Sequence, residues 1–86
     1  MNKRLQDEVD RLLCAARECM QLSNYDLAAE NIKAALRLIR DERGPADLWI
    51  ADVFEELALV HAATGKHLKC ASIRNRVRVI RQKHSA

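Results

Sequence analysis

The chain has 86 residues and a formal net charge of +3; 49% of its residues are hydrophobic and 31% are charged. This length allows one small domain, and a composition with two glycines, one proline and three aromatic residues is typical of a packed helical protein rather than a disordered one. No apolar run approaches the ~20 residues that span a bilayer, and the N-terminal residues lack the apolar core of a signal peptide. We therefore expect an all-α, cytoplasmic protein without a membrane span.

The cysteines and the charges narrow the class of protein further. Cys14, Cys19 and Cys70 cannot all pair within the chain, and their spacing matches no zinc or redox motif, so they favour a reducing compartment. Residues 1–65 carry twelve acidic and eight basic side chains, whereas residues 66–86 carry seven basic side chains and no acidic one. The C-terminal segment is therefore the basic part of the chain.

The first half of the chain predicts two amphipathic helices. Residues 3–22 place apolar side chains at helical spacing and form the first. Ser23 is expected to cap the second helix, which runs to about Asp41, with Asp26 near its positive N-terminus. The apolar positions are Leu5, Val9, Leu12, Ala16 and Cys19 in the first helix and Leu27, Ala28, Ile32, Ala35, Leu38 and Ile39 in the second.

The second half predicts another helix pair. Gly44-Pro45 interrupts the helical pattern, and Asp47 then stands at the N-cap position of a third helix over about 48–64. Gly65 is expected to end that helix in the left-handed conformation, and a fourth helix follows from about His67 to Lys83. The third helix is apolar on two sides, which indicates that neighbours cover both. Its apolar positions are Trp49, Ile50, Val53, Phe54, Leu57, Ala58, Val60 and His61, and those of the fourth helix are Cys70, Ile73, Val77 and Ile80.

The two halves are related by an internal repeat. The pattern of Ser23 to Ile39 returns forty-two positions later, from Gly65 to Arg81, so that Ala28 falls on Cys70. A fixed period indicates a repeat architecture, in which each unit buries its apolar face against its neighbour. The sequence therefore predicts two copies of a helix pair in one domain of 1–86: repeat one over about 5–41, a connection over 42–46 and repeat two over about 47–83.

Small and aromatic residues at fixed places in both copies carry a family resemblance. They are Ala16, Tyr25, Ala28 and Ala35 in the first copy, and Ala58, His67 and Cys70 in the second. Gly44-Pro45 leads into the second copy through Ala51, and the second copy then contains E-E-L-A-L-V-H over 55–61 and Gly65-Lys66-His67. This pattern resembles tetratricopeptide repeats, and its long period is similar to that of kinesin light chains and related bacterial proteins. The resemblance implies two stacked antiparallel helix pairs in a right-handed superhelix, whose concave groove binds peptides or partner helices.

The resemblance also implies which residues line that groove. Where the longer repeats usually carry paired asparagines, this chain has Glu55 and Glu56. An apolar floor with acidic edges would prefer a helix or peptide with apolar and basic residues, although the same charges also fit an ordinary solvated helix face. The candidate partner-binding residues are Asp10, Leu13, Cys14, Arg17, Met20, Asp52, Glu55, Glu56 and Leu59.

An alternative surface is the basic last helix. Arg74, Arg78 and Arg81 are spaced to present a cationic side that would bind phosphates, which would make the chain a small nucleic-acid-associated or regulatory protein. Three aromatic residues leave little for bases to stack on, and basic residues near a helix C-terminus also complement its dipole. A protein or peptide partner is therefore favoured over nucleic acid.

Catalysis and metal binding find little support. His61, His67 and Cys70 are residue types that bind zinc, but the resemblance accounts for all three as packing positions. No nucleophile, base and orienting group occur at a recognisable spacing, and no glycine-rich phosphate loop is present. We expect no enzyme activity, no cofactor and no metal. Because stacked repeats usually need about three units, we expect a homo-oligomer or an obligate hetero-partner to supply the missing burial.

Overall fold

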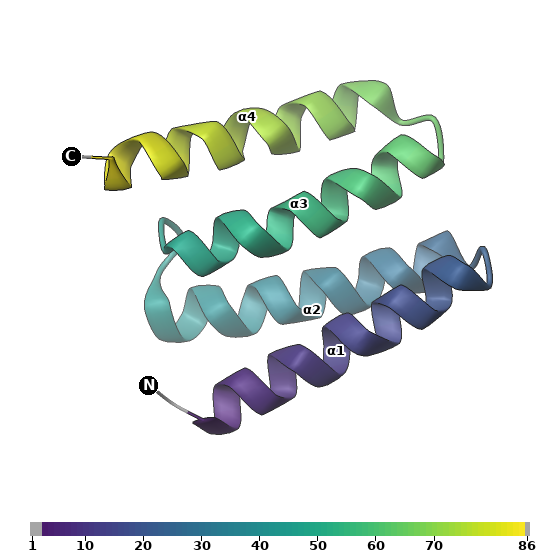
Figure 1. Ribbon diagram of the computed structural model, residues 1–86, viewed down its shortest axis with the longest axis horizontal. Helices are drawn as coiled ribbons and strands as arrows, with labels where there is room; N and C mark the ends of the chain where they lie inside the picture. The colour runs from purple at the N-terminus through teal and green to yellow at the C-terminus, as the bar shows by residue number, and fades with distance from the viewer. Residues whose placement is uncertain (1–2, 86) are drawn as a thin grey trace.

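The fold is all-α, as expected. The computed structural model describes residues 3–85, and every regular element in this range is an α-helix. Figure 1 shows the helices lying side by side in chain order, in a flattened molecule with extents of 37 × 30 × 16 Å. The helices are α1 (Lys3–Gln21), α2 (Tyr25–Arg43), α3 (Leu48–Ala63) and α4 (His67–His84).

Each helix packs mainly against its neighbour in the chain. The contacts join α1 to α2, α2 to α3 and α3 to α4, and the α2–α3 interface is the smallest of the three. Short turns reverse the chain within each pair, so that α1 and α2 are antiparallel, as are α3 and α4 (Figure 1). The structure thus contains the two expected helix pairs, and the right-handed superhelical stacking stays a prediction.

The buried stripe of α2 contains small residues. Ala28 and Ala35 are fully buried, with Ile32 and Ile39 buried on the same helix, and small side chains let packed helices approach closely. On α1 the buried residues run along one stripe: Leu5, Val9, Leu13 and Ala16.

Two details of this pair differ from the sequence-based expectation. Leu13 rather than Leu12 completes the buried stripe of α1, and Leu27 is 48% exposed. Leu12 and Leu13 both lie one turn beyond Val9, so helical spacing alone does not choose between them. Cys19 is half-buried at the edge of the core.

The predicted cap of α2 is wrong by one residue. Ser23 adopts a left-handed backbone with φ 59°, and Asn24 is the N-cap, with its Oδ1 accepting a 3.4 Å hydrogen bond from Leu27 N. The tight turn after α1 places the Ser23 side chain before the cap position, so a residue type suited to capping is not sufficient to locate the cap.

The predicted boundaries of α3 are confirmed. Asp47 caps the helix, and its Oδ1 accepts a 2.9 Å hydrogen bond from Trp49 N. Gly65 follows the C-terminal end with φ 74°, a conformation that costs glycine little because it has no Cβ. Buried residues occur on several sides of α3, whereas α4 buries a narrower stripe of Cys70, Val77 and Ile80.

The connection between the two pairs is held from three helices. Arg43 of α2 forms a 3.0 Å ion pair with Asp47, and its guanidinium carbon lies 5.6 Å from the centroid of the Trp49 ring. At the far end of the chain, His84 Nε2 donates a 2.7 Å hydrogen bond to the carbonyl oxygen of Ala46. These contacts fix the angle at which α3 leaves α2 and bring the end of α4 against the connection.

Candidate binding groove

The partner-binding residues that the sequence predicts do not all reach the surface. Leu13 is only 8% exposed and belongs to the core, so its assignment as an accessible anchor is wrong: its side chain packs within the core cluster instead. Leu59, by contrast, is 56% exposed. Of the remaining residues, Met20, Glu55 and Glu56 are half-buried, and Asp10, Cys14, Arg17 and Asp52 are exposed.

The acidic side chains on this side of α3 are already paired within the chain. Glu56 Oε1 accepts hydrogen bonds from Arg17 Nη2 at 2.6 Å and Arg17 Nε at 3.1 Å. The hydrogen bond and the charge of Glu56 raise the pKa of Arg17. On the other flank, Arg81 lies 3.4 Å from Asp52 and 4.0 Å from Glu55. The expected acidic edges are therefore largely neutralised by α1 and α4.

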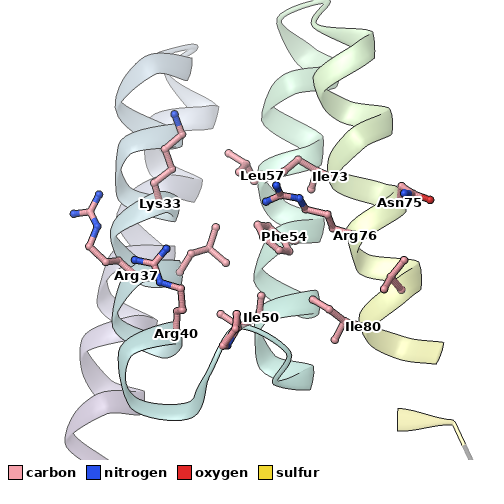
Figure 2. Close-up of a pocket in the computed structure, with 13 residues that line it drawn as sticks. Lys33, Arg37, Arg40, Ile50, Phe54, Leu57, Ile73, Asn75, Arg76 and Ile80 are labelled. Carbon is pink, nitrogen blue, oxygen red and sulfur yellow. The ribbon is translucent and has the colours of Figure 1, made fainter. Parts of the chain in front are cut away.

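A groove with the opposite charge lies on α2, α3 and α4. It has a volume of about 670 Å³ and is shown in Figure 2. Residues of all three helices line it, with α3 at its centre and α2 and α4 as its walls. Its apolar floor is formed by Leu36, Ile50, Phe54, Leu57, Ile73 and Ile80.

The floor follows from the apolar pattern of α3. Ile50, Phe54 and Leu57 are spaced i, i+4 and i+7 and so lie on one side of the helix. Ile50 and Leu57 are 3% and 4% exposed and merge with the core, whereas Phe54 is half-buried and keeps part of its ring open to the groove. Val79 of α4 adds an apolar side chain that is 42% exposed.

The rim of the groove is cationic. Lys33, Arg37 and Arg40 form a stripe along α2, and Arg76 extends over the groove from α4 (Figure 2). Arg40 lies 3.8 Å from the neighbouring Asp41. No carboxylate within residues 3–85 forms an ion pair with Lys33, Arg37 or Arg76, and no acidic side chain lines the groove.

The alternative phosphate-binding residues lie together on α4. Arg74, Arg78 and Arg81 line one shallow hollow, which Glu55 also lines. Arg81 is engaged by the carboxylates of α3, and Arg78 donates a hydrogen bond to Asn75 Oδ1. These three arginines thus line one hollow, and their phosphate-binding role stays a prediction that the Glu55 carboxylate in the same hollow opposes through charge repulsion.

The histidine and cysteine side chains are dispersed. His61 is 8% exposed, Cys70 is buried and Cys14 is exposed, and all three cysteines are free. Cys19 Sγ accepts a 3.9 Å contact from Asn31 Nδ2. Over residues 3–85 no three His, Cys, Asp or Glu side chains are grouped to hold a metal ion. No helix in this range has the length and hydrophobicity needed to cross a membrane.

Comparison of the chain with protein-family models, with curated proteins and with solved structures gave no match. The tetratricopeptide resemblance therefore stays a prediction.

Proposed function

We propose that the chain is a non-enzymatic protein-interaction module that binds a helix or peptide of a partner protein in the groove of α2, α3 and α4. The observation that supports this proposal is an apolar floor, partly open at Phe54 and Val79 and bordered by cations with no acidic side chain among the lining residues. Apolar surface left exposed and rimmed by polar residues marks interaction sites in many proteins. An adaptor or a small cytoplasmic chaperone would use such a groove.

The residues of the groove also support a binding role over a catalytic one. They include no His, Cys, Ser, Asp or Glu, and so offer neither the usual nucleophiles nor a carboxylate or imidazole base. The side of α3 that carries Leu59 is the weaker binding candidate, because its acids are paired and Leu13 is buried. A groove on the α2–α4 side thus replaces the acidic groove as the proposed site.

A matched pair of exposed apolar residues tests this proposal. Val79 lines the groove at 42% exposure, and Leu59 lies outside it at 56% exposure. Peptides selected from a displayed helical library against the wild-type protein would be titrated against Val79→Asp and Leu59→Asp, after circular dichroism has shown that both variants fold. We expect Val79→Asp to weaken binding by about tenfold or more and Leu59→Asp to change it by less than about twofold.

Two outcomes would contradict the proposal. If the selected peptides bind Val79→Asp as tightly as the wild-type protein, the groove is not the site. If Leu59→Asp alone abolishes binding, the side of α3 that faces α1 is the docking surface instead.

A further inference from the structure

We infer that the occupant of the groove is an acidic amphipathic helix of another protein, with an apolar stripe on the floor and Asp or Glu side chains on its flanks. This inference rests on the proposed function and deepens it, because it specifies the chemistry of the partner. Three properties of the groove support it: the spacing of its floor, its lack of backbone-binding groups and the distribution of its charges.

The floor has the dimensions of a short helical contact. Ile50 and Leu57 on α3, and Ile73 and Ile80 on α4, are each seven positions apart, which is about two turns or roughly 10 Å of helix. A helix that lies along this floor presents apolar side chains at i, i+3, i+4 and i+7, which is how amphipathic helices fill grooves. The occupant therefore needs about two to three turns of regular apolar spacing.

The groove offers little to an extended peptide. An extended segment leaves its backbone N–H and C=O groups to be satisfied by the site, whereas a helix satisfies them internally. Asn75 is the one uncharged polar side chain among the lining residues, and Figure 2 shows it pointing away from the floor. An apolar floor with a cationic rim suits a bound helix, because the flanks of a helix present side chains rather than free backbone groups.

The charges specify acidic flanks. Lys33, Arg37 and Arg40 lie at i, i+4 and i+7 along one wall, and Arg76 lies on the other. With no acidic residue among the lining side chains, a basic partner meets only like charges, and an acidic one gains steering and charge-assisted hydrogen bonds to the guanidinium groups. The α2 wall carries three cations and the α4 wall carries one. We therefore expect most acidic residues of the partner helix to lie on the edge that faces α2.

A second copy of the chain does not supply such a helix. The buried apolar stripes of α1, α2 and α4 belong to their own fold. The acids that accompany the exposed Leu59 on α3 are already paired with Arg17 and Arg81. The acidic residues of α1 are also interspersed with Lys3, Arg4, Arg11 and Arg17. The partner is therefore a different chain.

Three synthetic helices with one leucine stripe test the inference. Their flanks carry glutamate, glutamine or lysine, and their affinities are measured by fluorescence anisotropy at about 50 mM and about 300 mM NaCl. We expect the glutamate peptide to bind about tenfold more tightly than the glutamine peptide and the lysine peptide to bind least, with the differences shrinking at the higher salt concentration.

Charge-reversal variants serve as the matched controls. Arg37→Glu combined with Arg40→Glu leaves two basic and two acidic side chains around the groove and should remove the preference for the glutamate peptide, whereas Arg74→Glu combined with Arg78→Glu, on the other side of α4, should leave the order of the three peptides unchanged. Because Arg37 and Arg40 are exposed, their reversal leaves the core intact, and circular dichroism checks that both double variants fold.

The outcomes separate this inference from the proposed function. Equal, salt-independent binding of all three peptides would overturn the acidic partner and leave the groove as a binding site; no binding of any peptide would count against both. Binding of a short DNA duplex that Arg37→Glu combined with Arg40→Glu abolishes and Val79→Asp leaves unchanged would assign the groove cations to nucleic acid and overturn the inference. If light scattering shows a dimer and Val79→Asp dissociates it, the groove binds a second copy of the chain, and the inference of an acidic partner is overturned.

Discussion

His61 is a buried polar residue near the C-terminal end of α3, with 8% of its surface exposed. Burial is the main cause that lowers its pKa below the ordinary value of 6.5, and the positive charges of Lys69, Lys66 and Lys33 lower it further. No carboxylate is among the groups that shift it. The folded protein therefore holds His61 in its neutral form under conditions in which an unfolded chain begins to take up a proton.

This pKa shift predicts a loss of stability in acid. Above pH 6.5 the His61 side chain is neutral in both the folded and the unfolded state, so it adds no pH dependence to stability. Below pH 6.5 the unfolded state binds the proton first. The free energy of unfolding therefore falls with decreasing pH until the pH passes the pKa of His61 in the folded state. Replacing His61 by Phe should remove this component, whereas His67→Phe, at an exposed position, should retain it. Urea unfolding across this pH range measures the difference; parallel curves for His61→Phe and the wild-type protein would disprove it.

At the scale of single residues, the sequence predicts which type of residue fills a role, such as a buried leucine or a helix cap. It does not predict which of two neighbouring residues fills that role. Leu12 and Leu13 are both leucines within one turn of Val9, and only the packing of the helices in the fold selects Leu13 for the core. Ser23 and Asn24 are both good capping residues, and the backbone of the preceding turn selects Asn24. In each case two neighbours satisfy the same local rule, so the choice depends on tertiary geometry.

At the scale of helices, the start of α3 is specified by one carboxylate. Asp47 Oδ1 accepts the 2.9 Å hydrogen bond from Trp49 N, and Asp47 Oδ2 lies 3.0 Å from Arg43 Nε. Burial of this carboxylate acts to raise its pKa, but the hydrogen bonds from Trp49 and Arg43 and the charges of Arg43 and His84 outweigh it and lower the pKa. The anion is thus favoured where the helix begins.

Removing this cap should destabilise the protein measurably. We expect Asp47→Ala to lower the free energy of unfolding by about 1 kcal/mol, and Asp47→Asn to lower it less, because asparagine also caps a helix but does not pair with Arg43. Asp41→Ala, which removes an exposed carboxylate 3.8 Å from Arg40, should cost less than about 0.5 kcal/mol. Equal urea midpoints for Asp47→Ala and Asp41→Ala would contradict the capping role.

The apolar pattern of α3 shows what sequence periodicity leaves undecided. The pattern predicts cover on two sides, and α2 and α4 supply it. Phe54, however, belongs to a stripe that the sequence assigns to the core, and the structure leaves it half-buried in the groove. A side chain under a neighbouring helix and one at the bottom of a groove have the same apolar character, so only the spacing between α2 and α4 distinguishes them.

At the scale of the molecule, contacts between chain neighbours predict uneven local stability. The inner helices α2 and α3 each pack against two helices, whereas α1 and α4 pack mainly against one. Since helices with fewer buried contacts open more readily, we expect amide hydrogens in α1 and α4 to exchange faster than those in α2 and α3 by NMR. Binding of a peptide in the groove should slow exchange in α4 in particular. Uniform exchange rates across all four helices would instead indicate one cooperative unit.

The charge arrangement of the whole molecule was the least predictable property. The acids Asp52, Glu55 and Glu56 look like a binding edge in the sequence, but Arg17 and Arg81, far away along the chain, neutralise them. The cations of α2 look like a solvated side, and they become a groove wall because α4 stands opposite. Local spacing describes each helix well, and the pairing of charges between helices depends on how the helices stack.

The chain-order packing also affects how quickly the native state is reached. Because each interface joins helices that are consecutive in sequence, most loops that close during folding are short and lose little chain entropy. Helical proteins dominated by such local contacts fold within microseconds to milliseconds. Each helix pair can begin to form from contacts that are close in sequence, and the smaller α2–α3 interface then joins the two pairs into the native fold.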